Sequence, residues 1–173
     1  ILKATAAEVQ FMKPKERSSP YLGKGQHGVV RIAQDIKTNK YVAVKEIRNT
    51  LEVPNAIEIS AKEGEILQQL KGIPNIIPLY DEYYVKSEKV LYQFMYLAGF
   101  GEGSLLAQKL RNQSKSVNNA ILVEAAKELR QGVIGMQKRH IYHFDLKPSN
   151  FMFDMKGTLY IVDFGSAKKL EQG

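Results

Sequence analysis

The chain has 173 residues and contains no cysteine. It can therefore form neither a disulfide framework nor a metal site built on thiolates. No apolar run reaches the roughly 20 residues that a membrane-spanning helix requires, and the N-terminal residues do not follow the order of a signal peptide. These absences predict a soluble protein without a membrane span, and we expect it to act in the cytoplasm.

The excess of basic residues is modest and is not concentrated in one place. Lys and Arg number 25 against 18 Asp and Glu, which gives a formal net charge of +7. The basic residues are scattered and no basic strand rich in aromatic residues is present, so we expect no nucleic-acid partner. A content of 44% hydrophobic and 25% charged residues is typical of a globular protein with a buried core.

Short segments with strand character dominate the first half, after residues 1–20, which we interpret as an N-terminal extension. Apolar runs separated by polar or glycine-containing turns predict an antiparallel sheet of five strands. A helix is expected over Asn55–Lys71, because apolar residues recur on one face until Gly72. The predicted strands are Tyr21–Leu22, Val29–Ala33, Tyr41–Ile47, Ile76–Tyr84 and Lys89–Phe94.

The second half has mainly helical character, with a short helix predicted over Ser104–Arg111 and a long one over Asn118–Lys138. The long helix has an apolar side that includes Leu122, whereas Val123 lies off that side, so we expect some bare apolar surface.

The order of these elements predicts an α+β fold in two parts. The first part, 21–97, holds the five-stranded sheet and one helix, and the second, 98–173, is mainly helical. A hinge is expected near Met95–Gly99, with a cleft between the parts.

Three glycines, Gly23, Gly25 and Gly28, have the G-x-G-x-x-G spacing. Because glycine has no Cβ, the backbone amides of such a loop can approach phosphate oxygens. Alone, this spacing is more often an ordinary turn. A strand rather than a helix follows it, which favours a phosphate-covering hairpin over a dinucleotide-binding crossover.

A lysine and a glutamate are predicted to form an internal ion pair. Strand periodicity places Ala43 and Lys45 on one face, so the Lys45 ammonium points where Ala43 points. In the predicted helix, Glu63 lies within the apolar stripe, four residues before Leu67. A carboxylate that faces inward is costly unless it is paired, and Lys45 is its candidate partner. The alternative is a frayed stripe with a solvated Glu63.

Two acids and an amide follow the long helix. Asp145 is placed to accept or orient a hydroxyl proton, and Lys147 to balance charge on a transferred phosphoryl group. Asn150 and Asp163, thirteen residues apart, offer the hard oxygen ligands that magnesium takes alongside phosphate. His143 has no second histidine at ligand spacing, so we interpret it as a packed scaffold residue.

Taken together, these residues resemble the protein-kinase family, in family order from about Tyr21 to Gly165. Lys147, two residues after Asp145, is similar to the serine/threonine branch. The motifs are the glycine loop, Val42-Ala43-Val44-Lys45, Glu63, His143-Phe144-Asp145-Leu146-Lys147-Pro148-Ser149-Asn150 and Asp163-Phe164-Gly165.

The resemblance implies a bilobal kinase fold that uses ATP and Mg²⁺ and acts on a protein substrate. It implies that Lys45 binds the α- and β-phosphates and that Asp145 is the base. Either Phe94 or Met95 would guard the back of the nucleotide pocket. The implied nucleotide contacts are Gly23, Gly25, Gly28, Val30, Ala43, Lys45, Met95, Tyr96, Leu97 and Met152.

Two features depart from the family pattern. Phe144 replaces the usual arginine that pairs with a phosphate on the activation segment, so we expect activity that does not depend on that phosphate. Non-arginine versions occur in plant receptor-like kinases and in compact bacterial effector kinases, which act in the host cytosol. The sequence also stops eight residues after Gly165, before the distal part of the large lobe.

The early end of the sequence leaves three explanations open: a shortened chain, a compact kinase completed by an activating protein partner, or a fragment that binds nucleotide without turnover. The expected activity is transfer of the γ-phosphate of ATP to serine or threonine hydroxyls of proteins. The alternatives are a pseudokinase-like nucleotide-binding scaffold and a small-molecule phosphotransferase, although the latter usually lacks this glycine loop and Lys147.

Overall fold

The computed structural model divides the chain into two compact units. Residues 1–65 and 78–97 form the first, and residues 66–77 and 98–173 form the second. The chain changes unit after Leu97, where the predicted parts also meet, but residues 66–77 belong to the second unit. The structure describes residues 9–11, 21–24, 28–35, 38–99, 101–102 and 115–171.

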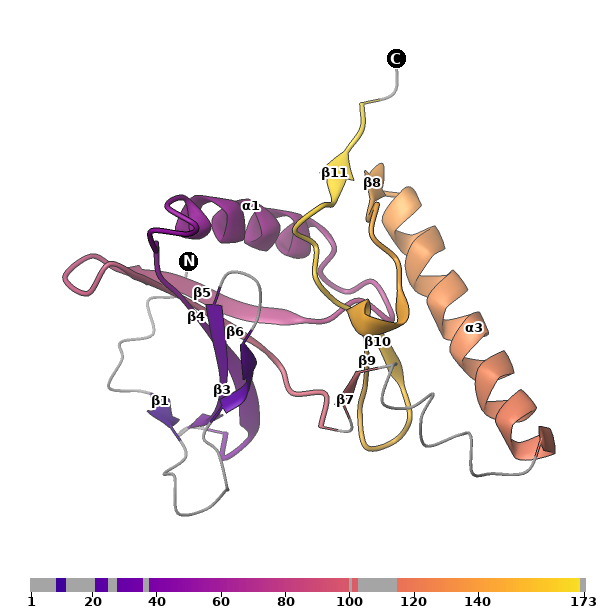
Figure 1. Ribbon diagram of the computed structural model, residues 1–173. Coiled ribbons are helices and arrows are strands. Elements are labelled where there is room, and N and C mark those ends of the chain that lie inside the picture. The colour runs from indigo at the N-terminus through magenta and orange to yellow at the C-terminus, as the bar shows by residue number, and fades with distance from the viewer. Residues whose placement is uncertain are drawn as a thin grey trace. The chain divides into compact units, whose positions relative to one another are not determined.

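Six antiparallel strands form the sheet of the first unit (Figure 1). Their order is β1-β3-β4-β6-β5, and β2 pairs with β3. The five predicted strands are present, and the sixth, β1, lies within the segment interpreted as an extension. The strands are β1 (Val9–Phe11), β2 (Tyr21–Lys24), β3 (Gly28–Asp35), β4 (Tyr41–Ile47), β5 (Leu79–Val85) and β6 (Val90–Tyr96).

The last two strands begin later than predicted, for local reasons. Strand β5 starts at Leu79, directly after Pro78, which has no amide to donate. Ile77, expected in that strand, instead donates its amide to the Ile161 carbonyl of the second unit at 3.1 Å. Strand β6 starts after Lys89, whose φ of 53° belongs to a turn.

Helix α1 (Ala56–Gln69) follows β4 and is close to its predicted range. The Ile57 amide in its first turn donates to Asn49 Oδ1 at 2.9 Å, which satisfies one of the amides that a helix start leaves free.

Alternate residues of β4 and β6 supply two separate cores. Val44 and Phe94 are cross-strand partners and belong to one buried cluster. Ile47 and Leu91 belong to the other cluster, which packs against the first turns of α1. Lys45 is two residues before Ile47 on the same strand, so its side chain lies on the same face of the sheet, the face that α1 covers.

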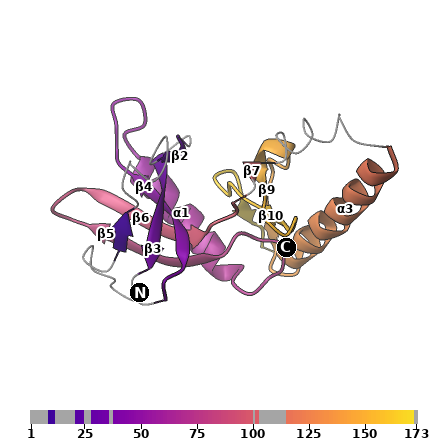
Figure 2. The same cartoon turned by 90° about the horizontal axis from the view of Figure 1, so that it is seen from below.

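The described part of the second unit contains helix α3 (Lys115–Gln137), a 3₁₀ turn (Pro148–Asn150) and five short strands. Strands β10, β9 and β7 form one small sheet (Figure 2), and β11 pairs with β8 (Figure 1). Strands of two or three residues are too short to show a period, so the sequence did not predict them. They are β7 (Gly101–Glu102), β8 (Ile141–Tyr142), β9 (Phe151–Phe153), β10 (Leu159–Ile161) and β11 (Lys168–Lys169).

Helix α3 begins three residues before its predicted start and packs through small and buried residues near its C-terminal end. A side chain at Gly135 would overlap with Ile73, and Met136 is only 2% exposed. Leu122 and Val123, near the other end, are 56% and 53% exposed, which is the bare apolar surface expected from the sequence. The helix predicted over Ser104–Arg111 lies outside the described residues.

Of the helices in the described ranges, none combines the length and the apolar character needed to cross a membrane.

Candidate active site

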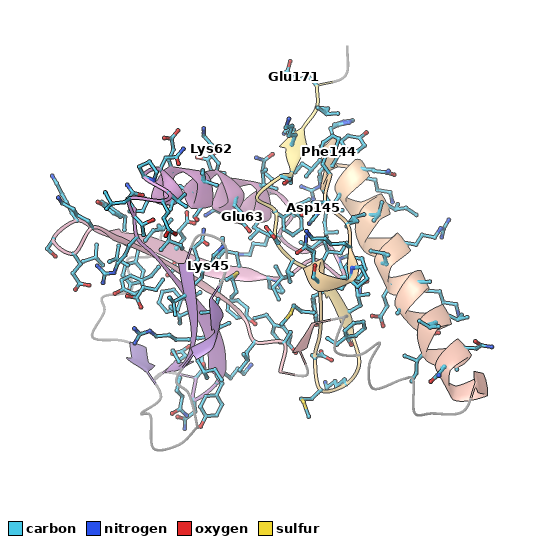
Figure 3. The ribbon with its side chains drawn as sticks, viewed as in Figure 1. Lys45, Lys62, Glu63, Phe144, Asp145 and Glu171 are labelled. Carbon is cyan, nitrogen blue, oxygen red and sulfur yellow. The ribbon has the colours of Figure 1, made fainter. Side chains whose placement is uncertain are left out.

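The first unit contains the ion pair predicted between β4 and α1 (Figure 3). Lys45 Nζ lies 3.7 Å from Glu63 Oε2, and the two side chains are 15% and 8% exposed. The neighbouring Lys62 points away from this pair and contacts Glu58 at the surface. Desolvation of each buried charge costs several kcal/mol, which an accurately placed partner offsets. The helix therefore holds one ammonium in an inward position.

Strand register decides which residues share the face of Lys45. Ala43 is opposite Met95 on β6, whereas Val44 is opposite Phe94. Ala43 and Lys45 lie on the α1-facing side, so Met95 lies there too, while Phe94 packs in the core on the other side. Of the two alternatives for the back of the nucleotide pocket, only Met95 is on the lysine's face.

The glycine-rich hairpin is described only in part. Gly23 on β2 is paired with Val30 on β3, and Val30 is in turn opposite Lys45 on β4. A Cβ at Gly28 would lie 2.5 Å from the carbonyl oxygen of Glu46, so only glycine fits against β4 at this position. Gly25 lies outside the described residues.

The other implied nucleotide contacts are divided between the units. Tyr96 ends β6, where its amide donates to the Pro78 carbonyl at 3.0 Å, and Leu97 follows it. Met152 is half-buried on β9 of the second unit, opposite Tyr160. Their roles as nucleotide contacts stay predictions.

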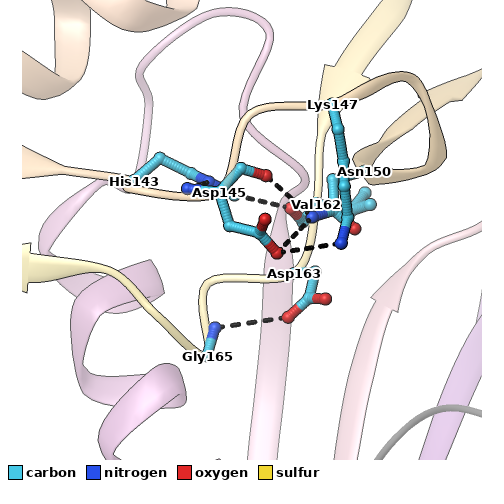
Figure 4. A network of polar contacts seen from close by, with 7 residues as sticks. All are labelled: His143, Asp145, Lys147, Asn150, Val162, Asp163 and Gly165. Carbon is cyan, nitrogen blue, oxygen red and sulfur yellow. Dashed lines mark hydrogen bonds and ion pairs between the residues drawn. The ribbon is translucent and has the colours of Figure 1, made fainter.

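In the second unit, Asn150 holds the carboxylate of Asp145 (Figure 4). Asn150 Nδ2 donates to Asp145 Oδ2 at 3.1 Å and to the Asp145 carbonyl at 2.9 Å. Asn150 is only 5% exposed and sits at the end of the 3₁₀ turn that Pro148 begins. The loop therefore presents the Asp145 carboxylate in one orientation, as a proton acceptor requires.

His143 is a scaffold residue, as the sequence predicted. It is 3% exposed, and its Nε2 donates to the Val162 carbonyl at 2.8 Å while its Nδ1 accepts from the Asp145 amide at 3.2 Å. Its ring meets Phe164 edge-on, with centroids 5.0 Å apart. These contacts connect the segment around Asp145 to the segment that carries Asp163.

Asn150 and Asp163 offer oxygens that suit magnesium. The backbone of Asn150 accepts from the Val162 amide at 2.9 Å, so the two residues belong to adjoining segments. Because the Asn150 bonds to Asp145 use Nδ2, its Oδ1 is left to face a cation, and Asp163 has an exposed carboxylate. A neutral and an anionic oxygen match a cation that takes its other ligands from phosphate and water.

The described ranges hold no group of three or more His, Cys, Asp or Glu that could bind a metal by themselves.

Lys147 lies beside the same carboxylate. Its Nζ is 3.3 Å from Asp145 Oδ2, and the two side chains are 54% and 38% exposed. A contact this exposed contributes little to stability. Because the contact is weak, the Lys147 ammonium can turn toward a negatively charged group that approaches Asp145.

Phe144 occupies a conformation that is rare for a large side chain. Its φ is 64°, it is 61% exposed, and its ring centroid lies 6.2 Å from that of Tyr142. Asp163 also has a positive φ, of 57°. Each such residue costs of order 1–3 kcal/mol, and such residues concentrate at functional sites. Phe144 carries no charge, so it cannot pair with a phosphate.

Sequence reasoning missed two polar residues next to the ion pair. Gln93 is 1% exposed on β6, and its Nε2 donates to Glu82 Oε2 at 2.7 Å. The available signal was a single amide in the otherwise apolar and aromatic run Val90–Tyr96. A buried glutamine needs partners, as Glu63 does.

The chain matches one family model over most of its length. Residues 17–173 match the model described as protein kinase domain.

Several curated proteins are similar to the same region. Mitogen-activated protein kinase kinase 2 from Arabidopsis thaliana is 30% identical over 146 residues, which are 83% of this chain and 38% of that protein. CBL-interacting serine/threonine-protein kinase 12, also from Arabidopsis thaliana, is 30% identical over 172 residues, 92% of this chain and 34% of the relative. Cyclin-dependent kinase 7 from Carassius auratus is 34% identical over 151 residues, 86% and 42% of the two chains. The chain spans less than half the length of these relatives.

Proposed function

Because the chain belongs to the protein kinase family, we propose that it transfers the γ-phosphoryl group of ATP to serine or threonine hydroxyls of protein substrates, with Mg²⁺ as a second cofactor. The family match over residues 17–173 supports phosphoryl transfer to protein. The serine/threonine preference is supported by Lys147, two residues after Asp145, and by the similarity to CBL-interacting serine/threonine-protein kinase 12.

The observation that carries this proposal is the orientation of the Asp145 carboxylate by Asn150. In the proposed reaction, the Asp145 carboxylate, held at Oδ2 by Asn150, orients the substrate hydroxyl and accepts its proton as the hydroxyl oxygen attacks. Lys147, 3.3 Å from Asp145 Oδ2, turns toward the transferred group and offsets its negative charge. Little further covalent chemistry is needed, because positioning and charge neutralisation dominate phosphoryl transfer.

The remaining residues hold the triphosphate. A bound Mg²⁺ would act as a Lewis acid that offsets negative charge on the phosphate oxygens. In the second unit, Asn150 Oδ1 and the Asp163 carboxylate would hold that ion. In the first unit, Lys45, fixed by Glu63, would contact the α- and β-phosphates of ATP. Backbone amides of the glycine hairpin of the first unit, to which Gly23 and Gly28 belong, would approach phosphate oxygens as well.

ATP with Mg²⁺ is expected to stabilise the protein, because a ligand that binds only the folded state adds stability. At a ligand concentration of about 100 times Kd, the gain is about 2.7 kcal/mol. Differential scanning fluorimetry with ATP and MgCl₂ measures it. The Asp163→Ala variant is expected to lose most of the magnesium-dependent part. Glu171→Ala, which removes an exposed carboxylate of the same unit, is the control and keeps the full shift.

Turnover separates this function from the alternatives. A pseudokinase-like scaffold gives the thermal shift without transferring labelled phosphate to any protein, itself included. A small-molecule phosphotransferase gives ATP consumption that depends on a small acceptor. The filled positions Lys45, Asp145, Asn150 and Asp163 favour the protein kinase, since a scaffold has no need of all four.

Activity is expected to be independent of phosphorylation of the segment that follows Gly165. The Phe144 side chain has no positive charge with which to bind a phosphate there. A sample treated with phosphatase is expected to transfer labelled phosphate at the rate of the untreated protein. A treated sample that is inactive, and that recovers when this segment is phosphorylated again, contradicts the prediction.

A protein partner that activates the chain, and a cytoplasmic location, stay predictions from the sequence.

A further inference from the structure

Three polar residues form a row across the sheet beneath α1, and only Lys45 among them was anticipated. Lys45 on β4 is opposite Gln93 on β6, and Gln93 is opposite Glu82 on β5. Residues opposite one another in a sheet project from the same face. Lys45, Gln93 and Glu82, hereafter the polar row, therefore all face α1.

A β-bulge sets the third member of the row. The register between β5 and β6 shifts between Leu79 and Asp81, so that Asp81 is opposite Phe94 and Glu82 is opposite Gln93. Without this shift, the outward-facing and inward-facing residues of β5 would exchange places, and Asp81 would occupy the row.

Each member of the row contacts α1 within little more than one turn. Lys45 pairs with Glu63 at 3.7 Å, and Gln93 Nε2 donates to the Ser60 carbonyl at 2.8 Å. The Glu82 carboxylate occupies the space beside Gly64, where any side chain would overlap with Glu82 Oε2. Helix α1 therefore rests on three strands through an ion pair, a hydrogen bond and one close steric contact, at Glu63, Ser60 and Gly64.

These contacts are specific in direction, unlike the apolar packing at the start of α1. The two hydrogens of Gln93 Nε2 are both used, one by the Ser60 carbonyl and one by Glu82 Oε2 at 2.7 Å. Gln93 is 1% exposed, so loss of either acceptor leaves a buried donor unsatisfied. The hydrogen bond to the Ser60 carbonyl and the close approach of Glu82 to Gly64 thus set both the rotation of α1 and its height above the sheet.

We propose that Gln93, Glu82 and Gly64 are positioning residues that hold α1 in the one orientation that brings Glu63 to Lys45. The inference rests on the proposed function, in which Lys45 contacts ATP. It adds a support for α1 that comes from β5 and β6, whereas Lys45 itself is on β4.

The electrostatic surroundings of Glu82 agree with a closely packed, partly buried carboxylate. Burial raises the pKa of the Glu82 carboxyl, the Gln93 hydrogen bond lowers it, and the nearby charges of Glu65, Asp81 and Glu63 raise it further. The ionised form is thus held against a net cost in the folded state. An amide at this position keeps an oxygen for Gln93 and removes that cost, which makes Glu82→Gln a conservative variant.

Disruptive and conservative variants test the proposal through kinetics. Gly64→Ala displaces the Glu82 carboxylate while favouring the helix itself, and Gln93→Leu removes both hydrogen bonds. Because misplacement by about 1 Å can cost about 100-fold, we expect each to lower kcat/KM for ATP by at least about 10-fold, with the KM for the protein substrate unchanged. Glu82→Gln is expected to retain activity, whereas Glu82→Leu is not. Ser60→Ala is the matched control, since the Ser60 contact uses its backbone oxygen.

A second readout does not depend on activity. A water-soluble carbodiimide joins an amine to a carboxylate in contact with it, so mass spectrometry can quantify the Lys45–Glu63 link. The link between Lys62 and Glu58, 3.1 Å apart on the surface of the same helix, is the internal reference. We expect the ratio of the two links to fall in Gly64→Ala and Gln93→Leu and to stay unchanged in Glu82→Gln and Ser60→Ala.

The two readouts separate the possible failures. An unchanged link ratio in both disruptive variants overturns the positioning role, even if their melting temperatures fall. A ratio that falls as expected, in a protein that transfers no phosphate in any form, supports the positioning role and contradicts the proposed function instead.

Discussion

Replacing Asp145 by asparagine is expected to lower the rate of phosphoryl transfer by roughly 100- to 10,000-fold, the usual contribution of a positioned general base. The amide has nearly the same size, and its oxygen can still accept from Asn150 Nδ2, so the loop keeps its shape. What is lost is the ability to take a proton from the substrate hydroxyl. Single-turnover transfer from labelled ATP to casein, and to the protein itself, measures the effect.

The matched control for this variant is Asp154→Asn in the same unit. Asp154 is 5% exposed and accepts from the Lys156 and Thr158 amides through one oxygen, which an asparagine retains. We expect its transfer rate to equal that of the wild type. Asp145→Asn should also keep the thermal shift with ATP and Mg²⁺. A variant that transfers phosphate at the wild-type rate contradicts a base role, and one that loses the shift assigns Asp145 to binding instead.

The sheet could be predicted from the sequence because its strands are long enough to show alternation. The ends of its strands could not be predicted, because they depend on single residues and on their contacts with distant parts of the chain. Ile76 and Ile77 have strand character, yet both belong to the second unit, where the Ile77 amide donates to the Ile161 carbonyl, and β5 begins only after Pro78. The bulge near Leu79, which decides the face of Glu82, has no counterpart in the hydrophobic pattern.

The candidate site was predictable where burial of a charge is costly. Glu63 breaks an apolar stripe, and a carboxylate in that position needs a cation, so the pair with Lys45 followed from the sequence. Gln93 obeys the same rule but was missed, since a neutral amide breaks the pattern less visibly than a charge. Glu82 was missed because the bulge that places it opposite Gln93 leaves no trace in the hydrophobic pattern. Their partners, the Ser60 carbonyl and the space beside Gly64, are backbone features that no side-chain pattern reports.

In the second unit, residue spacing indicated the chemistry but not how the loop is held. Backbone groups take part in the hydrogen bonds that hold it. Asn150 Nδ2 donates to the Asp145 carbonyl, and His143 bonds to the Val162 carbonyl and the Asp145 amide. Packing of α3 likewise depends on Gly135 lying against Ile73, a contact that an apolar stripe of large residues does not predict.

Replacing Lys45 by methionine is expected both to abolish transfer and to destabilise the fold. The substitution keeps the length of the side chain but leaves Glu63, which is 8% exposed, without its cation. Removing one partner of a buried pair typically costs about 3–5 kcal/mol. Urea unfolding, followed by circular dichroism, measures the loss. Lys62→Met, on the exposed side of α1, is the control and should change stability by less than about 0.5 kcal/mol.

The double variant Lys45→Met with Glu63→Leu separates the two effects. When both charges of a buried pair give way to apolar side chains of similar size, stability is often restored or even increased, because neither charge has to be desolvated. We therefore expect the double variant to regain most of the stability lost by Lys45→Met and still to transfer no phosphate. Recovery of transfer would show that the ammonium serves the fold alone. A single variant as stable as the wild type would show instead that Glu63 does not depend on Lys45, and the ion pair could not then be what fixes the ammonium toward ATP.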